Sequence, residues 1–121
     1  TDSNQVRSAF TPQTRAIWIE TPSNPLLKVI DIGAVAGLAR ARGCISICDN
    51  TFLSPYLQRP LDFGVDIVVH STTKYLNGHS DVVAGTLTVA RDSETWQRVK
   101  AVRVQIGGIA GPFEAWLLTR G

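Results

Sequence analysis

The sequence predicts an α/β protein, with a sheet of three parallel strands and one reversed strand covered by helices on both faces. Short apolar runs with few charges are typical of strands buried on both faces of a sheet. Four such runs occur, at residues 15–20, 44–49, 65–70 and 82–90. A helical pattern lies between the first two runs, as in a parallel strand–helix–strand crossover.

The connection lengths set the expected strand directions. About 23 residues separate the first run from the second, and about 15 separate the second from the third. Both exceed the roughly twelve residues that a parallel crossover requires. The third and fourth runs are about 11 residues apart, with no helical pattern between them. We therefore expect the fourth strand to run antiparallel to the third.

Local signals predict the first half of the chain. Residues 1–14 are polar and contain a proline, which favours a loop or the tail of a missing element. The segment 30–42 is predicted to be a helix, because Asp31 can cap its start and Gly43 follows an arginine-rich last turn. Its apolar face is formed by Ile32, Val35, Ala36, Leu38 and Ala39.

The second half has two prolines in the segment 51–64, which allow only short helical turns around Tyr56 and Leu61. Residues 71–81 form a polar turn. Two further helices are predicted, at 92–106 and 112–120, separated by a pair of glycines that ends the first.

The composition excludes several classes of protein. With 44% hydrophobic residues the chain of 121 residues can bury a core, which excludes a disordered chain. A net charge of +2 gives no field that favours nucleic acid or an acidic membrane. Charges interrupt every apolar stretch well below the length of a membrane span. The sequence contains no Met, so we expect a piece of a longer chain.

The two cysteines, Cys44 and Cys48, lie in one predicted strand. Residues four apart in a strand are separated by about 13 Å, which is too far for a disulfide. Their spacing is not that of a zinc or redox motif either. We expect two reduced, buried thiols and a cytoplasmic protein.

Polar residues follow each of the three parallel strands. The first strand is followed by 20–24 (ETPSN), the second by 49–51 (DNT) and the third by 71–74 (STTK). Ligands bind outside the carboxyl ends of strands in such sheets. We therefore expect a carboxylate, an amide, hydroxyls and an amine to meet at one edge.

Each of these residues also has an ordinary structural interpretation. A lone lysine in a polar turn is more often solvated than reactive, and Ser71 and Thr73 could simply cap the turn. The Asp49 carboxylate could pair with a backbone amide or an arginine instead of a ligand. Taken together, however, Lys74, Asp49 and two hydroxyls are the set that pyridoxal phosphate requires: a Schiff-base amine, a partner for the pyridine nitrogen and phosphate donors.

The motifs themselves resemble a known family. The segments are ETPSNP (20–25), DNTFLSP (49–55), HSTTKYLNGHSD (70–81) and PFEAWLLTRG (112–121). They resemble the Cys/Met-metabolism family of pyridoxal-phosphate enzymes, the group of cystathionine gamma-synthase, cystathionine gamma-lyase and methionine gamma-lyase. The resemblance extends over nearly the whole chain from Thr14. It implies part of the large domain of a fold-type I, aspartate-aminotransferase-like enzyme.

The resemblance also implies roles for individual residues. Lys74 would form the internal aldimine and move protons at the α and β carbons of the substrate, while Asp49 would keep the ring nitrogen protonated. Ser71 and Thr73 would bind the phosphate, Thr51 would lie near the ring and Asn24 would contact the substrate carboxylate. Glu20 is assigned to anchoring its loop, and Tyr75, His70 and His79 to packing and turn structure. No metal site is expected.

The activity implied is transsulfuration, by γ-replacement or γ-elimination on a homoserine- or homocysteine-derived amino acid. Methionine gamma-lyase and O-acetylhomoserine sulfhydrylase activities, an aminotransferase and a non-catalytic fragment stay open as alternatives. The resemblance implies a homo-oligomer, a dimer of dimers, in the full-length enzyme. Residues 1–121 would be a partial cofactor-binding domain without its N-terminal part and C-terminal domain, and we expect this chain alone to be inactive.

Overall fold

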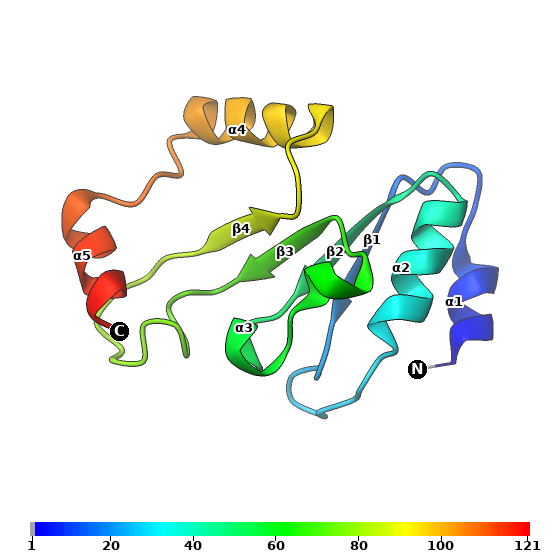
Figure 1. Ribbon diagram of the computed structural model, residues 1–121, viewed down its shortest axis with the longest axis horizontal. Coiled ribbons are helices and arrows are strands. Elements are labelled where there is room, and N and C mark those ends of the chain that lie inside the picture. The colour runs from blue at the N-terminus through cyan, green and yellow to red at the C-terminus, as the bar shows by residue number, and fades with distance from the viewer. Residues whose placement is uncertain (1) are drawn as a thin grey trace.

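The computed structural model describes residues 2–121 and contains one four-stranded sheet in the order β1-β2-β3-β4 (Figure 1). The strands are β1 (Ala16–Glu20), β2 (Ile45–Asp49), β3 (Ile67–His70) and β4 (Thr86–Val89). The pairs β1–β2 and β2–β3 are parallel, and β3–β4 is antiparallel. The predicted α/β class and all strand directions are therefore confirmed.

Helices precede, connect and follow these strands, and a 3₁₀ turn, η1, lies between β2 and β3. The elements are α1 (Ser3–Ala9), α2 (Ile32–Ala41), α3 (Ser54–Leu57), η1 (Pro60–Phe63), α4 (Glu94–Ile106) and α5 (Pro112–Arg120). Of the two alternatives expected at the start of the chain, the loop does not describe residues 3–9, since α1 forms there. Its start is stabilised by the Asp2 carboxylate, which accepts from the Asn4 N–H at 2.8 Å.

Helix α2 builds the core against one face of the sheet. Asp31 caps it by accepting from the Ala34 N–H at 2.9 Å, and Gly43 follows it with a φ of 64°. Its side chains Ile32, Val35 and Ala36 pack with strand residues in one cluster of buried side chains. The strand residues of that cluster are Ile19, Cys48 and Val68. The helix thus fixes the three parallel strands and the edge that follows them.

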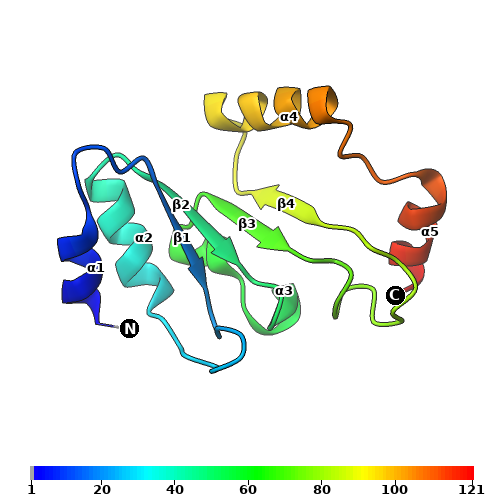
Figure 2. The ribbon, with the colours of Figure 1, turned by 180° about the vertical axis from the view of Figure 1, so that it is seen from behind.

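The opposite face of the sheet is covered less completely. Trp18 is 59% exposed and Leu87 is 44% exposed, and α4 buries none of its residues. Helix α4 runs beside β4, while α1 and α2 lie at the other end of the molecule (Figures 1 and 2). Within residues 2–121 the helices therefore bury one face of the sheet and leave part of the other open, so the expected cover on both faces is only half present.

Strand β4 begins at Thr86, four residues later than the apolar run predicts. Ala84, two residues before the strand, is bonded to the loop after β3 instead, because its N–H donates to Thr73 Oγ1 at 2.9 Å and its carbonyl accepts from the Thr73 N–H at 3.2 Å. Because Ala84 pairs with Thr73, it bonds to the polar loop after β3 and does not join strand β4.

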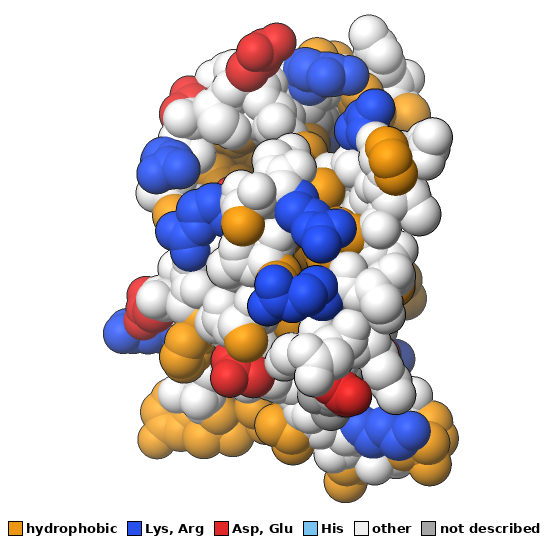
Figure 3. Space-filling model, turned by 90° about the vertical axis from the view of Figure 1, so that its right-hand side faces the viewer, with side chains coloured by type: hydrophobic (Ala, Val, Ile, Leu, Met, Phe, Trp, Pro, Cys, Tyr) orange, Lys and Arg blue, Asp and Glu red, His pale blue; other side chains and the backbone are white. Residues whose placement is uncertain are grey.

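Charged and hydrophobic side chains are distributed differently over the surface. Basic and acidic side chains are scattered over one side of the molecule, with hydrophobic side chains gathered at its lower end (Figure 3). Among residues 2–121, no helix is long and apolar enough to cross a membrane. Cys44 and Cys48 are both buried and both free.

Candidate functional site

The carboxyl ends of β2 and β3 are joined by a chain of hydrogen bonds. The Thr51 N–H donates to Asp49 Oδ1 at 2.9 Å, and Thr51 Oγ1 accepts from the Ser71 N–H at 2.8 Å. Thr51 therefore connects the half-buried Asp49 carboxylate to the first residue after β3. Asp49 and Thr51, both predicted to lie at the ring of the cofactor, are thus brought close to Ser71, which is predicted to bind its phosphate.

The loop that carries Lys74 is a compact turn. The Lys74 N–H donates to the Ser71 carbonyl at 3.1 Å, and the Gly78 N–H donates to the Lys74 carbonyl at 2.8 Å. Gly78 has a φ of 70°, a conformation that favours glycine. The backbone of Lys74 is thus held on both sides, while its exposed side chain projects from the turn.

Four of the predicted site residues line one pocket with a volume of about 830 Å³. They are Asn24, Thr51, Thr73 and Lys74. Asp49 and Ser71 do not line this pocket, but both are bonded to Thr51, which does. The pocket therefore draws on all three strand ends, as the order of the parallel strands predicts.

Several polar groups at this edge keep bonding capacity. Among residues 2–121, neither the second carboxylate oxygen of Asp49, nor the Ser71 hydroxyl, nor the Lys74 ammonium has a hydrogen-bonding or ion-pair partner. The Thr73 hydroxyl differs, because it donates to the Ala84 carbonyl at 3.1 Å. For Thr73 to donate to a ligand, that bond would have to break.

Three pocket residues received other assignments or none from the sequence. Glu20, assigned to loop anchoring, lines the pocket. Tyr75, assigned to packing, is exposed at the pocket and meets Phe52 edge-on, with ring centroids 6.2 Å apart. Asp81 was not singled out at all. The aromatic pair is invisible in the sequence because 23 positions separate its members.

Asp81 anchors the far wall of the pocket. It accepts from Asn77 Nδ2 at 3.0 Å and from the Arg120 guanidinium of α5. The hydrogen bond from Asn77, followed by the hydrogen bond and the positive charge of Arg120, holds the pKa of the Asp81 carboxyl below its ordinary value. The sequence offers only one sign of this contact, the acidic residue in the turn Gly-His-Ser-Asp. Its partner Arg120 lies 39 positions away.

Of the histidines, His79 fits its assignment to turn structure, with Nδ1 2.6 Å from the Asn77 carbonyl oxygen. His70 is buried at 6% exposure, as expected for a packing residue. Burial lowers its pKa below the ordinary value, although the Asp49 charge opposes this. Within residues 2–121, no group of His, Cys, Asp and Glu is arranged to hold a metal ion.

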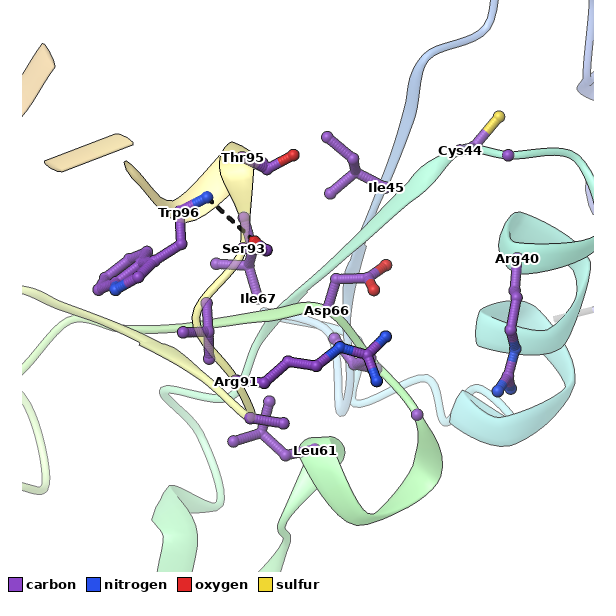
Figure 4. A pocket seen from close by; sticks show the side chains of 15 residues that line it. Arg40, Cys44, Ile45, Leu61, Asp66, Ile67, Arg91, Ser93, Thr95 and Trp96 are labelled. Atoms are coloured by element: carbon purple, nitrogen blue, oxygen red, sulfur yellow. Dashed lines mark hydrogen bonds between the residues drawn. The ribbon is translucent and has the colours of Figure 1, made fainter. Parts of the chain in front are cut away.

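A second pocket, of about 370 Å³, lies at the amino ends of the strands (Figure 4). Its carboxylate is already bonded, since Asp66 Oδ2 accepts from the Ser46 N–H at 2.8 Å and from the Ser46 hydroxyl at 2.7 Å. Arg40 and Arg91 line it without an ion pair to any described residue. No lysine is among the residues that line this pocket.

The residues at the carboxyl edge fit pyridoxal phosphate chemically. A primary amine can condense with the aldehyde, a carboxylate with one free oxygen can face the pyridine nitrogen, and the free Ser71 hydroxyl can donate to phosphate. The sheet, with three parallel strands, one antiparallel edge strand and flanking helices, together with this edge defines the class: the fold-type I pyridoxal-phosphate enzymes.

Comparison with known proteins identifies the family within this class of enzymes. The sequence model described as "Cys/Met metabolism PLP-dependent enzyme" matches residues 1–121, and the chain belongs to that family. It is 50% identical over 120 residues to "Probable cystathionine gamma-synthase" of Herpetosiphon aurantiacus, covering 99% of this chain and 37% of that protein. It is 46% identical over 121 residues to "Cystathionine beta-lyase" of Coxiella burnetii, covering 100% of this chain and 31% of that protein.

A solved structure shows the same fold. The crystal structure of cystathionine gamma-lyase from Lactobacillus plantarum complexed with L-serine superposes with a TM-score of 0.92 and 51% identity. The match covers 98% of this chain and 31% of that one. The chain thus spans about a third of the length of the relatives it matches. The family and fold inferred from the motifs are confirmed, and with them the dependence of the family on pyridoxal phosphate.

Proposed function

We propose that this chain is part of the cofactor-binding large domain of a transsulfuration enzyme, and that Lys74 is its reactive amine. The reaction proposed is γ-replacement or γ-elimination on a homoserine- or homocysteine-derived amino acid. Relatives named as gamma-synthase, gamma-lyase and beta-lyase support the sulfur amino acid substrate class at nearly equal identity. We further propose a cytoplasmic homo-oligomer for the full-length enzyme.

The observation that carries this proposal is the meeting of Lys74, Asn24 and Thr51 at one pocket beside the Asp49 carboxylate. Bound pyridoxal phosphate would supply an electron sink that stabilises a carbanion at the α or β carbon of the substrate. Lys74 Nζ would bind the cofactor and move protons at those carbons. The Asp49 carboxylate would hold the proton on the pyridine nitrogen.

The remaining residues would bind and orient. The Ser71 hydroxyl has no partner among the described residues and can donate to a phosphate oxygen directly. Thr73 would join it by exchanging its bond to the Ala84 carbonyl for one to phosphate. Asn24 is exposed in the loop after β1 and would bind the substrate carboxylate. Thr51, which follows β2, would lie near the pyridine ring of the cofactor.

Chemical trapping of the amine tests this proposal. The chain is incubated with pyridoxal 5′-phosphate, reduced with borohydride, digested and mapped by mass spectrometry. The chain contains three lysines, Lys28, Lys74 and Lys100, so each can be quantified. We expect one adduct per chain, on Lys74, which Lys74→Ala abolishes and Lys100→Ala leaves unchanged. Adducts distributed evenly over the three lysines would contradict the proposal.

A further inference from the structure

A cluster of side chains, formed by buried Asn50 and His70 and half-buried Gln58, ties all three parallel strand ends together. Asn50 follows β2 and has 0% exposure, and His70 ends β3. Gln58, which follows α3, bonds to Asn50, and its side chain also reaches the carbonyl of Thr21 after β1. None of these side chains takes part in the proposed chemistry directly.

Two backbone carbonyls set the orientation of both amides in the cluster. The Thr21 carbonyl can only accept, so the atom 2.8 Å from it must be Gln58 Nε2. The same nitrogen donates its second hydrogen to Asn50 Oδ1 at 2.8 Å. The Gln58 carbonyl likewise accepts from Asn50 Nδ2 at 2.8 Å. Each amide therefore has one possible orientation.

This orientation determines the protonation of His70. The second hydrogen of Asn50 Nδ2 faces His70 Nε2, 3.1 Å away. Because Nδ2 is a donor, Nε2 must accept, and an imidazole that accepts at Nε2 is neutral with its proton on Nδ1. Burial of His70 favours the same neutral form.

The cluster also sets the spacing of the groups beside it. Asn50 stands between Asp49 and Thr51, and His70 directly precedes Ser71. A charged His70 would present an N–H to the Asn50 amide hydrogens, so the side-chain bond between Asn50 and His70 would be lost. It would also place a positive charge near Asp49, which is the charged group acting on His70. Thr21 follows β1 and Gln58 follows α3, and neither side chain ionises. Thr86, which lies opposite His70 on β4, does not ionise either.

We propose that Asn50, Gln58 and His70 are positioning residues. They hold residues 49–51 at the end of β2 at a fixed distance from Ser71 after β3, and they do so only when His70 is the neutral Nδ1–H tautomer. The part of this inference that concerns cofactor loading rests on the proposed function. The hydrogen-bonding part does not. Acidification is therefore expected to break the side-chain bond between Asn50 and His70 and to slow adduct formation at Lys74.

The first readout needs no cofactor. Nitrogen-15 NMR of the imidazole rings of the full chain reports tautomer and charge, and the amide signals of Thr51 and Ser71 report the strand ends. We expect the Nδ1–H tautomer for His70 at about pH 7.5. As the pH falls through the titration of His70, the Thr51 and Ser71 amides should shift together with it. An Nε2–H or charged His70 at that starting pH would overturn the inference.

The decisive variant is His70→Gln, whose side-chain oxygen can accept the same bond from Asn50 and cannot titrate. The matched control is His79→Gln, which removes the other histidine. In His70→Gln the Thr51 and Ser71 amides should lose the acid shift, which His79→Gln should retain. An unchanged acid shift in His70→Gln would overturn the inference.

The second readout is the rate at which absorbance reports the reaction of pyridoxal 5′-phosphate with Lys74. Below the His70 titration the wild type and His79→Gln should react about tenfold more slowly than His70→Gln, the change expected for one pKa unit of altered interaction. Identical pH profiles would overturn the inference. If the wild type forms no adduct at any pH, the proposed function fails, whereas the amide shifts still decide the positioning network.

Asn50→Asp provides a second test if His70→Gln does not fold. The shape of the side chain is conserved, but a carboxylate oxygen now faces His70 Nε2. His70 should become protonated at neutral pH and donate from Nε2 to that carboxylate, so the Thr51 and Ser71 amides should show no acid shift over the range in which the wild type shifts. A neutral His70 in this variant would contradict the inference. The acid titration of the wild type alone decides the outcome if neither variant folds.

Discussion

The two ends of the sheet carry polar residues of similar kinds with opposite bonding. At the amino end, both the N–H and the hydroxyl of Ser46 donate to Asp66, and the Asp66 N–H returns a bond to Ser46 Oγ at 3.0 Å. At the carboxyl end, Asp49 accepts one bond from Thr51, while the ammonium group of Lys74 has no partner among residues 2–121. Polar groups that satisfy each other stabilise a fold, whereas groups with free bonding capacity beside a pocket are available to a ligand.

Next to the free groups at the carboxyl end lies a layer of bonded amides. The Asn50 and Gln58 amides use every N–H they have, and each donates one bond to a backbone carbonyl. Such a layer restricts the motion of the residues beside it. The carboxyl end therefore combines a rigid base with a reactive surface, which is the arrangement that an amine and a carboxylate at fixed spacing require.

The largest effect on folding is expected from Asp66→Ala at the amino end. Ser46 is 2% exposed, and the variant leaves its N–H and hydroxyl without their acceptor. We expect a loss of about 2 kcal/mol in the free energy of unfolding. Urea denaturation measures it, with Asp62→Ala as the control, because the exposed Asp62–Arg59 ion pair is worth less than about 1 kcal/mol.

Adduct formation at Lys74 should survive Asp66→Ala under conditions in which the variant is folded. If labelling of Lys74 disappeared together with stability, the two ends would be one cooperative unit and the comparison would fail.

Asp49→Asn is expected to have the converse effect. The amide oxygen can still accept from the Thr51 N–H, so stability should change by no more than about 0.5 kcal/mol. The negative charge is lost, and the affinity for pyridoxal 5′-phosphate should fall about tenfold, or about 1.4 kcal/mol. Equilibrium titration followed by absorbance measures this, with Asp62→Asn as the control.

An unchanged affinity in Asp49→Asn would remove this carboxylate from the proposed site. A stability loss as large as that of Asp66→Ala would assign Asp49 to the fold instead.

The smallest effect concerns the link from α5 to the Lys74 loop. The folded pKa of Asp81 is lowered, so its contribution to stability is complete above the unfolded pKa of about 3.9 and is lost as the pH falls through the folded value. Acidification below that range should therefore weaken the contact with Arg120. Asp81→Asn should show a flatter acid dependence of the denaturation midpoint than the wild type, and an identical dependence would contradict this assignment.

Much of the fold could be predicted because its signals are local. Apolar runs bounded by Pro22, Pro25 or Gly64 identify strands, Asp31 identifies a helix start, and connection lengths determine strand direction. The site followed from the same rules, since residues after parallel strands meet at one edge. Lys74, Thr51, Thr73 and Asn24 all line one pocket, and their roles there stay a prediction.

The parts that were not predicted depend on distant contacts or weak propensity. Helix α1 has seven residues and no buried side chain, so its pattern is too weak to recognise. The segment before β4 has strand-like residues, but Ala84 bonds to Thr73, 11 positions away. The contacts of Asn50 with His70, 20 positions apart, arise only once the sheet has formed.

The central claim is that ligand binding belongs to the carboxyl end of the sheet and structural bonding to the amino end. Amide NMR spectra of the full chain, recorded with increasing pyridoxal 5′-phosphate, test it most directly. The account predicts shifts concentrated at Asp49–Thr51 and Ser71–Lys74, with the amides of Ser46, Asp66 and Arg91 unchanged. Shifts concentrated at the amino end, or spread evenly over both ends, would contradict it.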